Sequence, residues 1–321
     1  MTRADEPEGE HREAPEGRKH RGKVRGRWSP SQWPKRRKIA VALFSAVLLI
    51  VVLGGTAYLY SAKPEYSLGI LTDEPGMSYQ GPDTVRSGFE VSMYRWMADY
   101  TDPEFDFTEL ERTIDNRDEA LRKQGSSPKA DAVIASYTMT DYRRTQVRFA
   151  GPYFLTRQGV MVKADGPLRN IGRAEDLADK TACAQKGSTS AEQLRRLSNG
   201  RVTVNERISL RECITDLYAD RVDAVSTDLI LLKGYANWAE TPNLLAPDST
   251  AFGTLDAYGI GLPLNASDHT CDQWTERIRR FITSGQWVQS YVENFHEQPA
   301  PDSMPSPDAI TACTDPMPPA P

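Results

Sequence analysis

The sequence predicts an α/β protein with a mainly parallel sheet, preceded by a single helix of membrane-spanning length. Three observations lead to this class. Short apolar runs alternate with amphipathic helical stretches from residue 66 to residue 228, polar side chains follow several of those runs, and a long uncharged segment stands before them. Strands that alternate with helices are typical of parallel sheets, whose carboxyl ends carry the ligand-binding loops of α/β proteins.

The charge of the chain is unevenly distributed. The 321 residues have a net charge of −5, but residues 1–38 contain twelve basic and six acidic residues, which leaves −11 for the remainder. We expect residues 1–38 to form a disordered cytoplasmic tail, because they contain almost no aliphatic side chains. A basic run can bind nucleic acid, but this one directly precedes the uncharged segment. We therefore expect it to contact anionic lipid and expect no nucleic-acid partner.

The uncharged segment, residues 39–60, predicts a transmembrane helix. Its 22 residues would extend roughly 33 Å as a helix, which is enough for the hydrocarbon core of a bilayer. The basic residues at positions 35–38 place the N-terminus in the cytoplasm and everything after residue 60 outside the cell. The predicted location is therefore the cell membrane, with a single pass. Removal of the helix by cleavage near residues 55–57, as in a signal peptide, is the alternative.

All four cysteines follow this segment, at Cys183, Cys213, Cys271 and Cys313. An even number of cysteines in an extracellular domain predicts disulfides, and four cysteines allow three pairings. Metal binding is the competing interpretation. It is weaker, because no two cysteines are close in sequence and neither His269 nor His296 has the spacing of a metal ligand.

Residues 64–158 predict the first part of the sheet. A strand at residues 66–71 ends at a turn over residues 73–76, and Ser87 with Glu90 three residues later forms a capping box that would begin a helix. Asn116 would cap a second helix. Further strands are expected at residues 130–136, 147–149 and 159–162.

The second part repeats the alternation. Strands are expected at residues 181–185, 202–204, 222–227 and 254–262, and helical segments at residues 174–177, 209–218, 229–238, 274–282 and 287–295. A further helix is expected after residues 186–190, with Leu194 and Leu197 on its inner side. From Glu297 onward eight of 25 residues are proline, which predicts an irregular tail pinned by Cys313.

Residues 136–143 carry the strongest functional signal. They read Ser-Tyr-Thr-Met-Thr-Asp-Tyr-Arg and follow an apolar strand. Ser136 and Thr138 would point to the same side, because side chains alternate along extended chain. Arg143 offers a planar fork of donors that fits a carboxylate with two parallel hydrogen bonds. The alternative is a capped strand end with a surface arginine.

Two more polar groups follow strands in the second part. Ser188 and Thr189 open a helix after Gly187, where unpaired backbone N–H groups make a natural anion site. Ordinary N-capping is the commoner role of such residues. Asp228 ends the strand at residues 222–227, where it would either contact a ligand or cap the following helix.

In this order and spacing, several segments resemble the polar amino-acid-binding proteins of ABC importers, the extracellular solute-binding proteins of family 3. The similarity covers roughly residues 66–296 and is greatest to the actinobacterial glutamate/glutamine-binding branch. The matching segments are Asn116-Arg117 with Leu121, residues 130–135, residues 138–143, residues 149–154, Gly187-Ser188-Thr189 and residues 221–228.

The resemblance implies a periplasmic-binding-protein-like type II fold, in which two lobes joined by two hinge strands close over the ligand. The solute-binding domain would take residues 64–296, with a first lobe of residues 64–158 and 255–296 and a second lobe of residues 159–254. By position, Arg143 would bind the ligand's α-carboxylate, with Thr138 and the helix start at Ser188 and Thr189 donating to the same group. Asp228 would accept from the α-ammonium, helped by Ser136. The same branch implies the disulfides Cys183–Cys213 and Cys271–Cys313.

Two positions depart from the family pattern. The aromatic residue that covers the ligand's side chain is not clearly present, so Met77 or Tyr79 would replace it. An acidic residue usual in the first helix is replaced by Ser92. Arg117 and Lys186 are candidates for holding an acidic ligand side chain.

The resemblance implies a membrane-anchored receptor that binds a glutamate/glutamine-like amino acid and delivers it to an ABC permease, without a cofactor. The alternative is an amino-acid sensor that signals through a partner membrane protein, as the basic tail and uncleaved anchor would allow. Catalysis, as in the few dehydratases of this fold, is not expected. The chain has no Ser/His/Asp or Cys/His set and no Gly-Lys-Ser phosphate loop.

Overall fold

The computed structural model describes residues 34–61, 63–101, 103–122, 129–197, 200–238, 240–311 and 313. The predicted disordered tail lies almost entirely outside the described residues, as does the end of the Pro-rich tail. The chain divides into two compact units, Met1–Ala62 and Lys63–Pro321. Each unit is described by itself.

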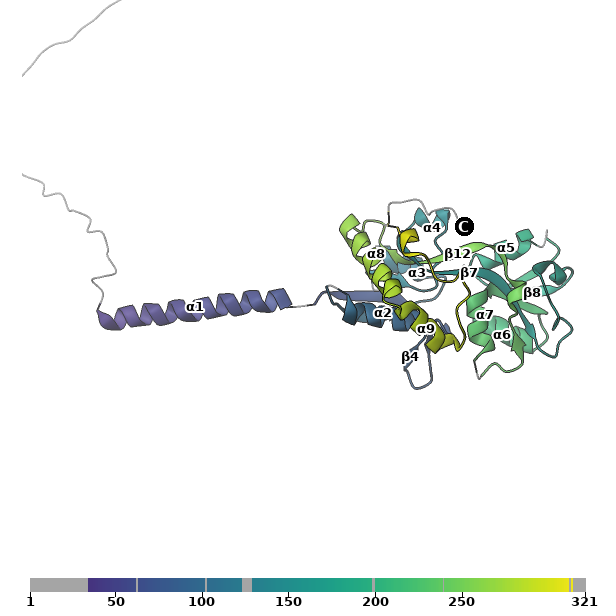
Figure 1. Cartoon of the computed structure of the whole chain (residues 1–321), viewed down its shortest axis with the longest axis horizontal. Coiled ribbons are helices and arrows are strands. Elements are labelled where there is room, and N and C mark those ends of the chain that lie inside the picture. Colours follow the sequence, from purple (N-terminus) through teal and green to yellow (C-terminus); the bar gives the residue numbers. More distant parts are fainter. Residues whose placement is uncertain are drawn as a thin grey trace, which may run out of the picture. The chain divides into compact units, whose positions relative to one another are not determined.

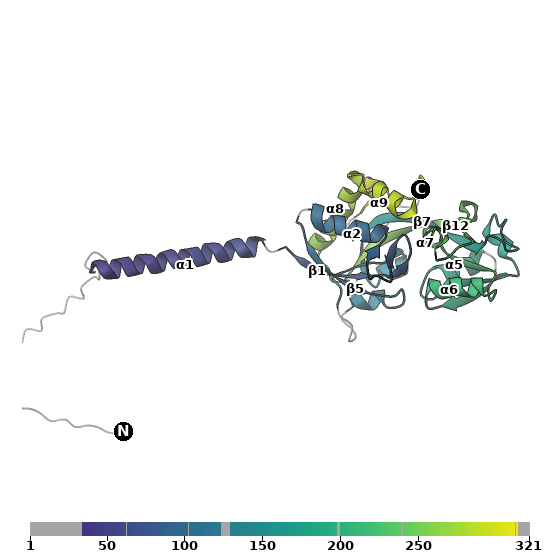
Figure 2. The same ribbon diagram turned by 90° about the horizontal axis from the view of Figure 1, so that it is seen from below.

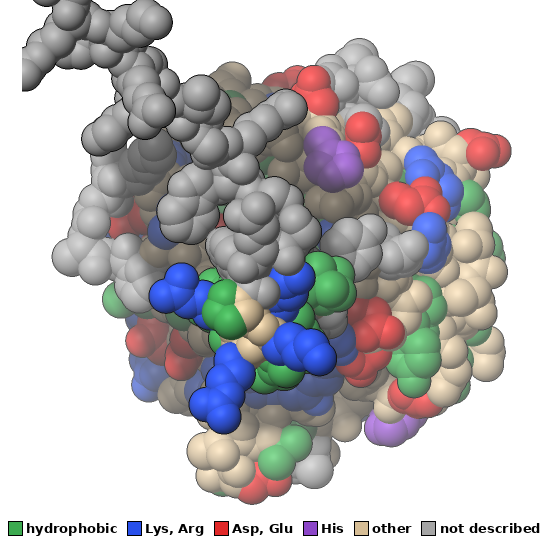
Figure 3. All heavy atoms as spheres, turned by 90° about the vertical axis from the view of Figure 1, so that its left-hand side faces the viewer, with side chains coloured by type: hydrophobic (Ala, Val, Ile, Leu, Met, Phe, Trp, Pro, Cys, Tyr) green, Lys and Arg blue, Asp and Glu red, His purple; other side chains and the backbone are tan. Residues whose placement is uncertain are grey.

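The described residues of the first unit form one helix, α1 (Lys35–Ser61), where the sequence predicts the membrane segment. Large apolar side chains such as Leu43, Phe44 and Ile50 are exposed along it. Figure 3 looks from the side on which α1 begins, and shows basic side chains gathered around apolar ones there. Among the described side chains, which in α1 end at Leu53, no helix is both long and apolar enough to cross a membrane. The transmembrane role of residues 39–60 therefore stays a prediction.

The second unit is organised on one mixed sheet. Its first half has three parallel strands, β5 (Asp106–Glu111), β1 (Glu65–Ile70) and β6 (Ala132–Ile134). Its second half also has three parallel strands, β10 (Ala224–Asp228), β8 (Thr181–Gln185) and β9 (Thr203–Arg207). Between the halves run two antiparallel strands, β12 (Phe252–Leu262) and β7 (Arg148–Lys163), and β11 (Leu244–Leu245) pairs with β7. The sheet confirms the predicted α/β class.

The prediction of two separate strands at residues 147–149 and 159–162 is wrong, because β7 is continuous for 16 residues. Polar residues at positions 156–158 interrupt the apolar pattern in the sequence. In the structure these residues are extended all the same, since β12 pairs along most of β7, for example Asp256 opposite Thr156 and Tyr258 opposite Phe154. The two long strands connect the two halves of the sheet, as the resemblance implies for hinge strands.

Helices gather on the two halves of the sheet, and we call these halves with their helices the first and second lobes. The first lobe has α2 (Phe89–Tyr100), α8 (Asp268–Thr283) and α9 (Gln286–Phe295), which pack on one another, and the second has α5 (Ser190–Leu197), α6 (Leu210–Tyr218) and α7 (Leu229–Ala236). In Figure 1 and Figure 2, β7 and β12 lie between the two groups of helices. The exact lobe boundaries stay as predicted from the resemblance.

An aromatic cluster fixes the first lobe's helices to the sheet. The ring of Phe89 lies 5.2 Å from those of Phe154 in β7 and Trp287 in α9. The indole of Trp287 also donates to the backbone oxygen of Tyr153 at 2.7 Å. Edge-to-face ring pairs of this kind add to the stabilisation from apolar burial.

The predicted capping box of α2 is wrong. Ser87 lies in β4 (Arg86–Ser87) of a small second sheet with β2 (Asp73–Glu74) and β3 (Ser78–Gln80), and α2 begins after Gly88 without a side-chain cap. Glu90 points instead toward β6, where its carboxylate accepts from the backbone N–H of Ser136 at 2.7 Å. A long-range contact has replaced the local one, because a buried backbone N–H needs a partner.

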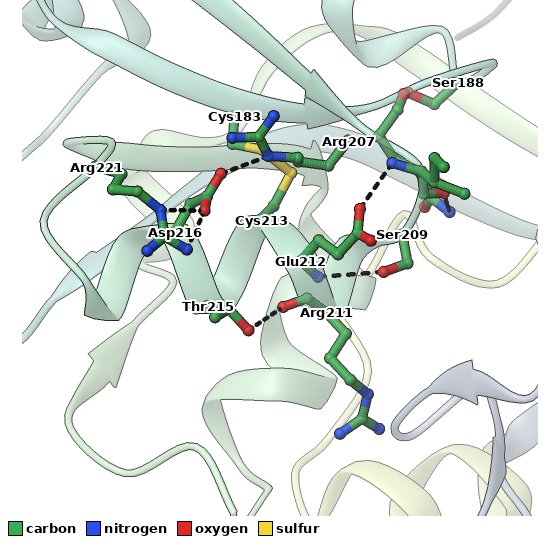
Figure 4. The surroundings of a disulfide bond; sticks show 12 residues. Cys183, Ser188, Arg207, Ser209, Arg211, Glu212, Cys213, Thr215, Asp216 and Arg221 are labelled. Atoms are coloured by element: carbon green, nitrogen blue, oxygen red, sulfur yellow. Dashed lines mark hydrogen bonds and ion pairs between the residues drawn. A yellow bond between two sulfur atoms is a disulfide. The ribbon is translucent and has the colours of Figure 1, made fainter.

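The second unit contains two disulfide bonds, Cys183–Cys213 and Cys271–Cys313. This is the pairing that the resemblance implies. Figure 4 shows the first of them, which joins β8 to α6. The second holds the C-terminal tail. Before reaching Cys313 this tail crosses β7, since the Leu155 N–H donates to the Ser303 oxygen at 2.9 Å and the Thr311 N–H to the Gly151 oxygen at 3.0 Å.

Candidate functional site

The predicted site residues of the first lobe lie beyond the carboxyl end of β6. Thr140 caps the short helix α4 (Asp141–Arg144) by accepting from the Arg143 N–H. Arg143 is only 8% exposed, and its guanidinium donates to the Thr138 oxygen at 3.0 Å. It also donates to the Gly187 oxygen at 3.2 Å. The arginine thus joins the two lobes, and the alternative of a surface arginine is excluded.

Burial and the neighbouring Arg117 guanidinium lower the pKa of Arg143 to about 10. A buried cation is disfavoured in this way when its charge is incompletely balanced. Carbonyl oxygens are its hydrogen-bond partners, and they carry only partial charge. The Arg143 guanidinium would therefore gain from an anionic group placed beside it.

The loop before α5 supplies the facing side of the site. Gly187 has a φ of +78°, a backbone conformation that favours glycine. The Ser188 hydroxyl donates to the Gln185 oxygen at 2.6 Å and accepts from the Ser190 N–H at 3.3 Å. Ser188 thus has the capping role weighed as the alternative to ligand binding. Thr189 is half-buried beside it.

Asp228 lies at the end of β10 and immediately before α7, but its side chain does not cap that helix. It is 6% exposed. One carboxylate oxygen, Oδ2, accepts from the hydroxyl of Tyr258 in β12, and the other, Oδ1, has no hydrogen-bond partner. The simple capping interpretation therefore fails for Asp228.

The electrostatic surroundings of Asp228 disfavour its charge. Burial, followed by the charge of Asp256, raises the pKa of the Asp228 carboxyl to about 7. The hydroxyl of Tyr258 and the charge of Arg143 oppose that rise without cancelling it. A cation placed beside Oδ1 would stabilise the ionised form.

Ser136 is held by the carboxylates of Glu74 and Glu90, neither of which was predicted to lie at the site. Its backbone has a φ of +44°, and its hydroxyl donates to Glu74 Oε2 at 2.6 Å. Its N–H donates to Glu90, which also accepts from the hydroxyl of Tyr153. Both glutamates are buried. The position of Glu74 directly after the first strand could have indicated a role at the site. Residues 73–76 also have the composition of a turn, and they were interpreted only in that way.

Arg117 is buried beside the loop that carries Ser136, and its Nε has no hydrogen-bond partner. Its guanidinium is 2% exposed, lies 4.2 Å from the centre of the Tyr137 ring and donates to the Ala135 oxygen at 2.7 Å. Arg117 therefore supports the loop that carries Ser136. The other candidate, Lys186, is exposed.

The residues considered as replacements for the family's aromatic residue lie elsewhere. Met77 is fully buried in the core. The ring of Tyr79 lies 5.0 Å from that of Trp238, which follows α7, and so contributes to the contact between the lobes.

Comparison with known proteins matches residues 66–297 to the model of one family, bacterial extracellular solute-binding proteins, family 3. The chain belongs to this family. This solute-binding protein is 28% identical over 276 residues to the glutamate-binding protein of Corynebacterium efficiens, covering 81% of this chain and 91% of the relative. It is 29% identical over 196 residues to the glutamine-binding protein of Geobacillus stearothermophilus, covering 60% of this chain and 71% of the relative.

The fold of this solute-binding protein also matches solved structures. An ancestral arginine-binding protein bound to arginine superposes with a TM-score of 0.63 at 24% identity, covering 73% of this chain and 99% of the other. The comparison confirms the type II periplasmic-binding-protein fold. The family and its relatives identify the protein as a binder of solutes and not as an enzyme. No cluster of potential metal ligands occurs among the described residues.

Proposed function

We propose that this protein binds a polar amino acid of the glutamate/glutamine class between its two lobes and delivers it to an ABC permease. The proposal rests on two buried groups of opposite charge, one from each lobe, neither of which has a full set of partners within the protein. Arg143 comes from the first lobe and has carbonyl partners, whereas Asp228 comes from the second lobe and has a free oxygen, Oδ1. The relatives named for glutamate and glutamine support the ligand class.

A free amino acid matches this pair of charges. Its carboxylate and ammonium must both find partners when they leave water, and the strongest partners are ionised groups of opposite sign. The α-carboxylate would bind Arg143, with Thr138 and Thr189 nearby, and the α-ammonium would bind Asp228. Each interaction would also favour the charged form of the protein group that makes it.

Contacts between the lobes support a closing mechanism. Besides the bond from Arg143 to Gly187, the Tyr235 hydroxyl of α7 donates to the Asp73 oxygen at 2.6 Å. A Cβ atom at Gly234 would lie 1.8 Å from the Pro75 oxygen, so the helix approaches this loop as only glycine allows. A ligand that contacts both lobes would stabilise the closed arrangement, and a permease could recognise that arrangement.

We further propose that α1 anchors the protein in the cell membrane, with the binding unit outside the cell. The uncharged residues 39–60, the basic residues before them and the exposed apolar side chains of α1 support the anchor. Cell membranes containing the full-length protein should retain it after a wash at high pH, whereas a protein lacking residues 1–62 should not sediment with them. Release of the full-length protein by the wash would contradict the anchor.

Calorimetric titration of the full-length, oxidised protein tests the binding function. We expect one of glutamate, glutamine, aspartate or asparagine to bind with a Kd of about 1 μM or lower, a free energy of about −8 kcal/mol. Arg143→Ala should abolish this binding and leave the fold intact, as measured by circular dichroism. Full affinity in the variant would remove Arg143 from the site.

Uptake of the labelled ligand by cells with and without the protein tests delivery. Loss of uptake without the protein is expected. Unchanged uptake despite tight binding would contradict delivery to a permease. It would favour the alternative function, an amino-acid sensor that signals through a partner membrane protein.

A further inference from the structure

The C-terminal tail is held on the first lobe at both ends. It begins where α9 ends, and the Cys271–Cys313 disulfide joins its far end to α8. Just before Cys313, the Ile310 side chain is 3% exposed and its backbone oxygen accepts from the Arg279 guanidinium of α8 at 3.2 Å. We call residues 297–311, which lie between these two attachments, the C-terminal strap.

The middle of the C-terminal strap lies on the strands that connect the lobes. The Leu155 N–H of β7 donates to the Ser303 oxygen at 2.9 Å, and Arg157 Nη2 lies 3.6 Å from Asp302 Oδ2. Arg157 also donates to a backbone oxygen of β12 at 3.1 Å, so the strap is linked to both connecting strands. Four of residues 298–307 are proline, which fixes φ and reduces the conformational freedom of the strap.

Glu297 joins the two lobes at the start of the strap. Its Oε1 accepts from the Tyr291 hydroxyl of α9, in the first lobe, at 3.1 Å and from Lys233 Nζ of α7, in the second lobe, at 2.9 Å. Lys233 Nζ also lies 2.7 Å from the Asp248 carboxylate. Burial acts to lower the pKa of Lys233, but the hydrogen bonds to Asp248 and Glu297 outweigh it and raise the pKa. Both carboxylates therefore stabilise the charged ammonium.

Between these contacts the strap and α7 are not tightly packed. A hollow of about 340 Å³ lies there, and its lining includes Leu229, Ile230 and Lys233 of α7 and Ala300 and Ser303 of the strap. Because open space separates the two elements, α7 can move relative to the strap without a steric clash. The charged contacts of the strap can therefore break and form again as the lobes rotate.

We propose that the C-terminal strap stabilises the closed arrangement of the lobes and thereby raises the affinity for the ligand without touching it. The lobes meet at the hydrogen bond from Arg143 to Gly187, and Lys233 is bonded to Glu297 in the same arrangement. When the second lobe rotates away, Lys233 moves with α7, whereas Glu297 stays with the first lobe. The inference rests on the proposed amino-acid binding and adds a control of closure to it.

The physical basis is a shift of population between open and closed arrangements. A contact made only in the closed arrangement increases the fraction of protein that is competent to bind, and the apparent affinity rises with that fraction. Among the described residues, no hydrogen bond or ion pair joins the strap to Arg143, Thr138 or Asp228. The strap should therefore change the affinity for every ligand by the same factor.

Calorimetric titration of the full-length, oxidised protein with glutamine, glutamate and arginine tests the strap. The double variant Glu297→Gln, Asp302→Asn removes the charge from both strap contacts and keeps the size of each side chain. We expect it to bind each ligand of the unmodified protein about three- to tenfold more weakly, as the loss of two partly exposed ion pairs allows. The factor should be the same for each ligand, and circular dichroism should show an unchanged fold.

The double variant Glu206→Gln, Asp179→Asn is the matched control. It makes the same chemical changes at two ion pairs within the second lobe, with Arg195 at 2.8 Å and with Arg201 at 3.2 Å. The side chain of Glu206 is 36% exposed, as is that of Glu297. Rotation of the lobes leaves these pairs unchanged, so the control should bind each ligand with full affinity.

Two outcomes would overturn the inference and leave the binding function intact. One is a strap variant whose affinities equal those of the control. The other is a loss of affinity that differs from ligand to ligand, since the strap would then act on the ligand and not on closure. If no amino acid binds to the unmodified protein, the proposed function itself is contradicted, and the inference with it.

Discussion

Two aspartates of the second lobe, Asp216 in α6 and Asp228 at the end of β10, both have little accessible surface but differ in their hydrogen-bond partners. Asp216 is 3% exposed and Asp228 6%. Arg207 donates to one oxygen of Asp216 and Arg221 to the other, each at 2.6 Å, as Figure 4 shows. Asp228 has a single phenol donor and one oxygen without a partner.

The pKa shifts follow this difference. Burial acts to raise the pKa of Asp216, but the hydrogen bonds from Arg221 and Arg207 outweigh it and lower the pKa. At Asp228 burial prevails and the pKa rises to about 7. Both oxygens of the Asp216 carboxylate have arginine donors within the fold, beside the Cys183–Cys213 disulfide. The carboxylate of Asp228 keeps one oxygen, Oδ1, without a partner, and we propose that the ligand's ammonium supplies it.

The largest effect is expected from Asp228→Asn. We predict that affinity for the best-bound amino acid falls by about a hundredfold or more, because truncating one partner of a buried charge pair costs at least 2–3 kcal/mol. Titration calorimetry of the full-length protein measures the loss. A decrease smaller than threefold would show that the ammonium lies elsewhere.

The same variant should behave differently without ligand. The folded-state pKa of Asp228 is raised, so its contribution to stability is present at low pH and is lost as pH rises through about 7. Above that pH the free energy of unfolding of Asp228→Asn should therefore exceed that of the unmodified protein. Chemical denaturation at pH 8 checks this, and a less stable variant would contradict the unsatisfied carboxylate.

Asp216→Asn should give the opposite pattern. We predict that it lowers the free energy of unfolding at pH 7 by about 1–3 kcal/mol, the range for losing hydrogen bonds between charged groups. Because the pKa of Asp216 is lowered in the folded state, this contribution is present at neutral pH and is lost in acid. Ligand affinity should stay unchanged. A large loss of affinity would erase the distinction between the two aspartates.

The smallest effect is the pH dependence of binding. The ligand's ammonium favours ionised Asp228, so binding below about pH 7 must release a proton. Affinity should be constant above pH 8 and fall by up to about tenfold between pH 7 and pH 6, the limit for one proton over one pH unit. In Asp228→Asn the remaining affinity should lose this dependence. The same slope in both proteins would assign the proton to another group, such as Glu74.

Much of the architecture follows from local sequence patterns. Strands predicted at residues 66–71, 181–185, 222–227 and 254–262 are present close to their predicted bounds, whereas β5 (Asp106–Glu111) was not predicted and α8 begins at Asp268, before the predicted residue 274. The position of Arg143 and Asp228 at strand ends could also be predicted. Carboxyl ends of strands in α/β sheets converge on one crevice, so a polar residue at such an end is informative in itself.

The features that could not be predicted from the sequence depend on contacts between residues far apart in the chain. Glu90 matched a local capping box, yet it bonds Ser136, 46 residues away. Glu74 accepts from the hydroxyl of the same serine, 62 residues away, and belongs to a segment whose sequence predicts a turn. Neither partner can be read from neighbouring residues. The long β7 was divided in two for a similar reason, since its polar middle is extended by pairing with β12.

A crystal structure of the protein with its best-bound amino acid would test most directly whether the incomplete charges form the binding site. We predict the α-carboxylate on the guanidinium of Arg143 and the α-ammonium within about 3 Å of Asp228 Oδ1, the usual hydrogen-bond distance. A ligand bound outside the two lobes, with Asp228 Oδ1 still unpartnered, would contradict this assignment.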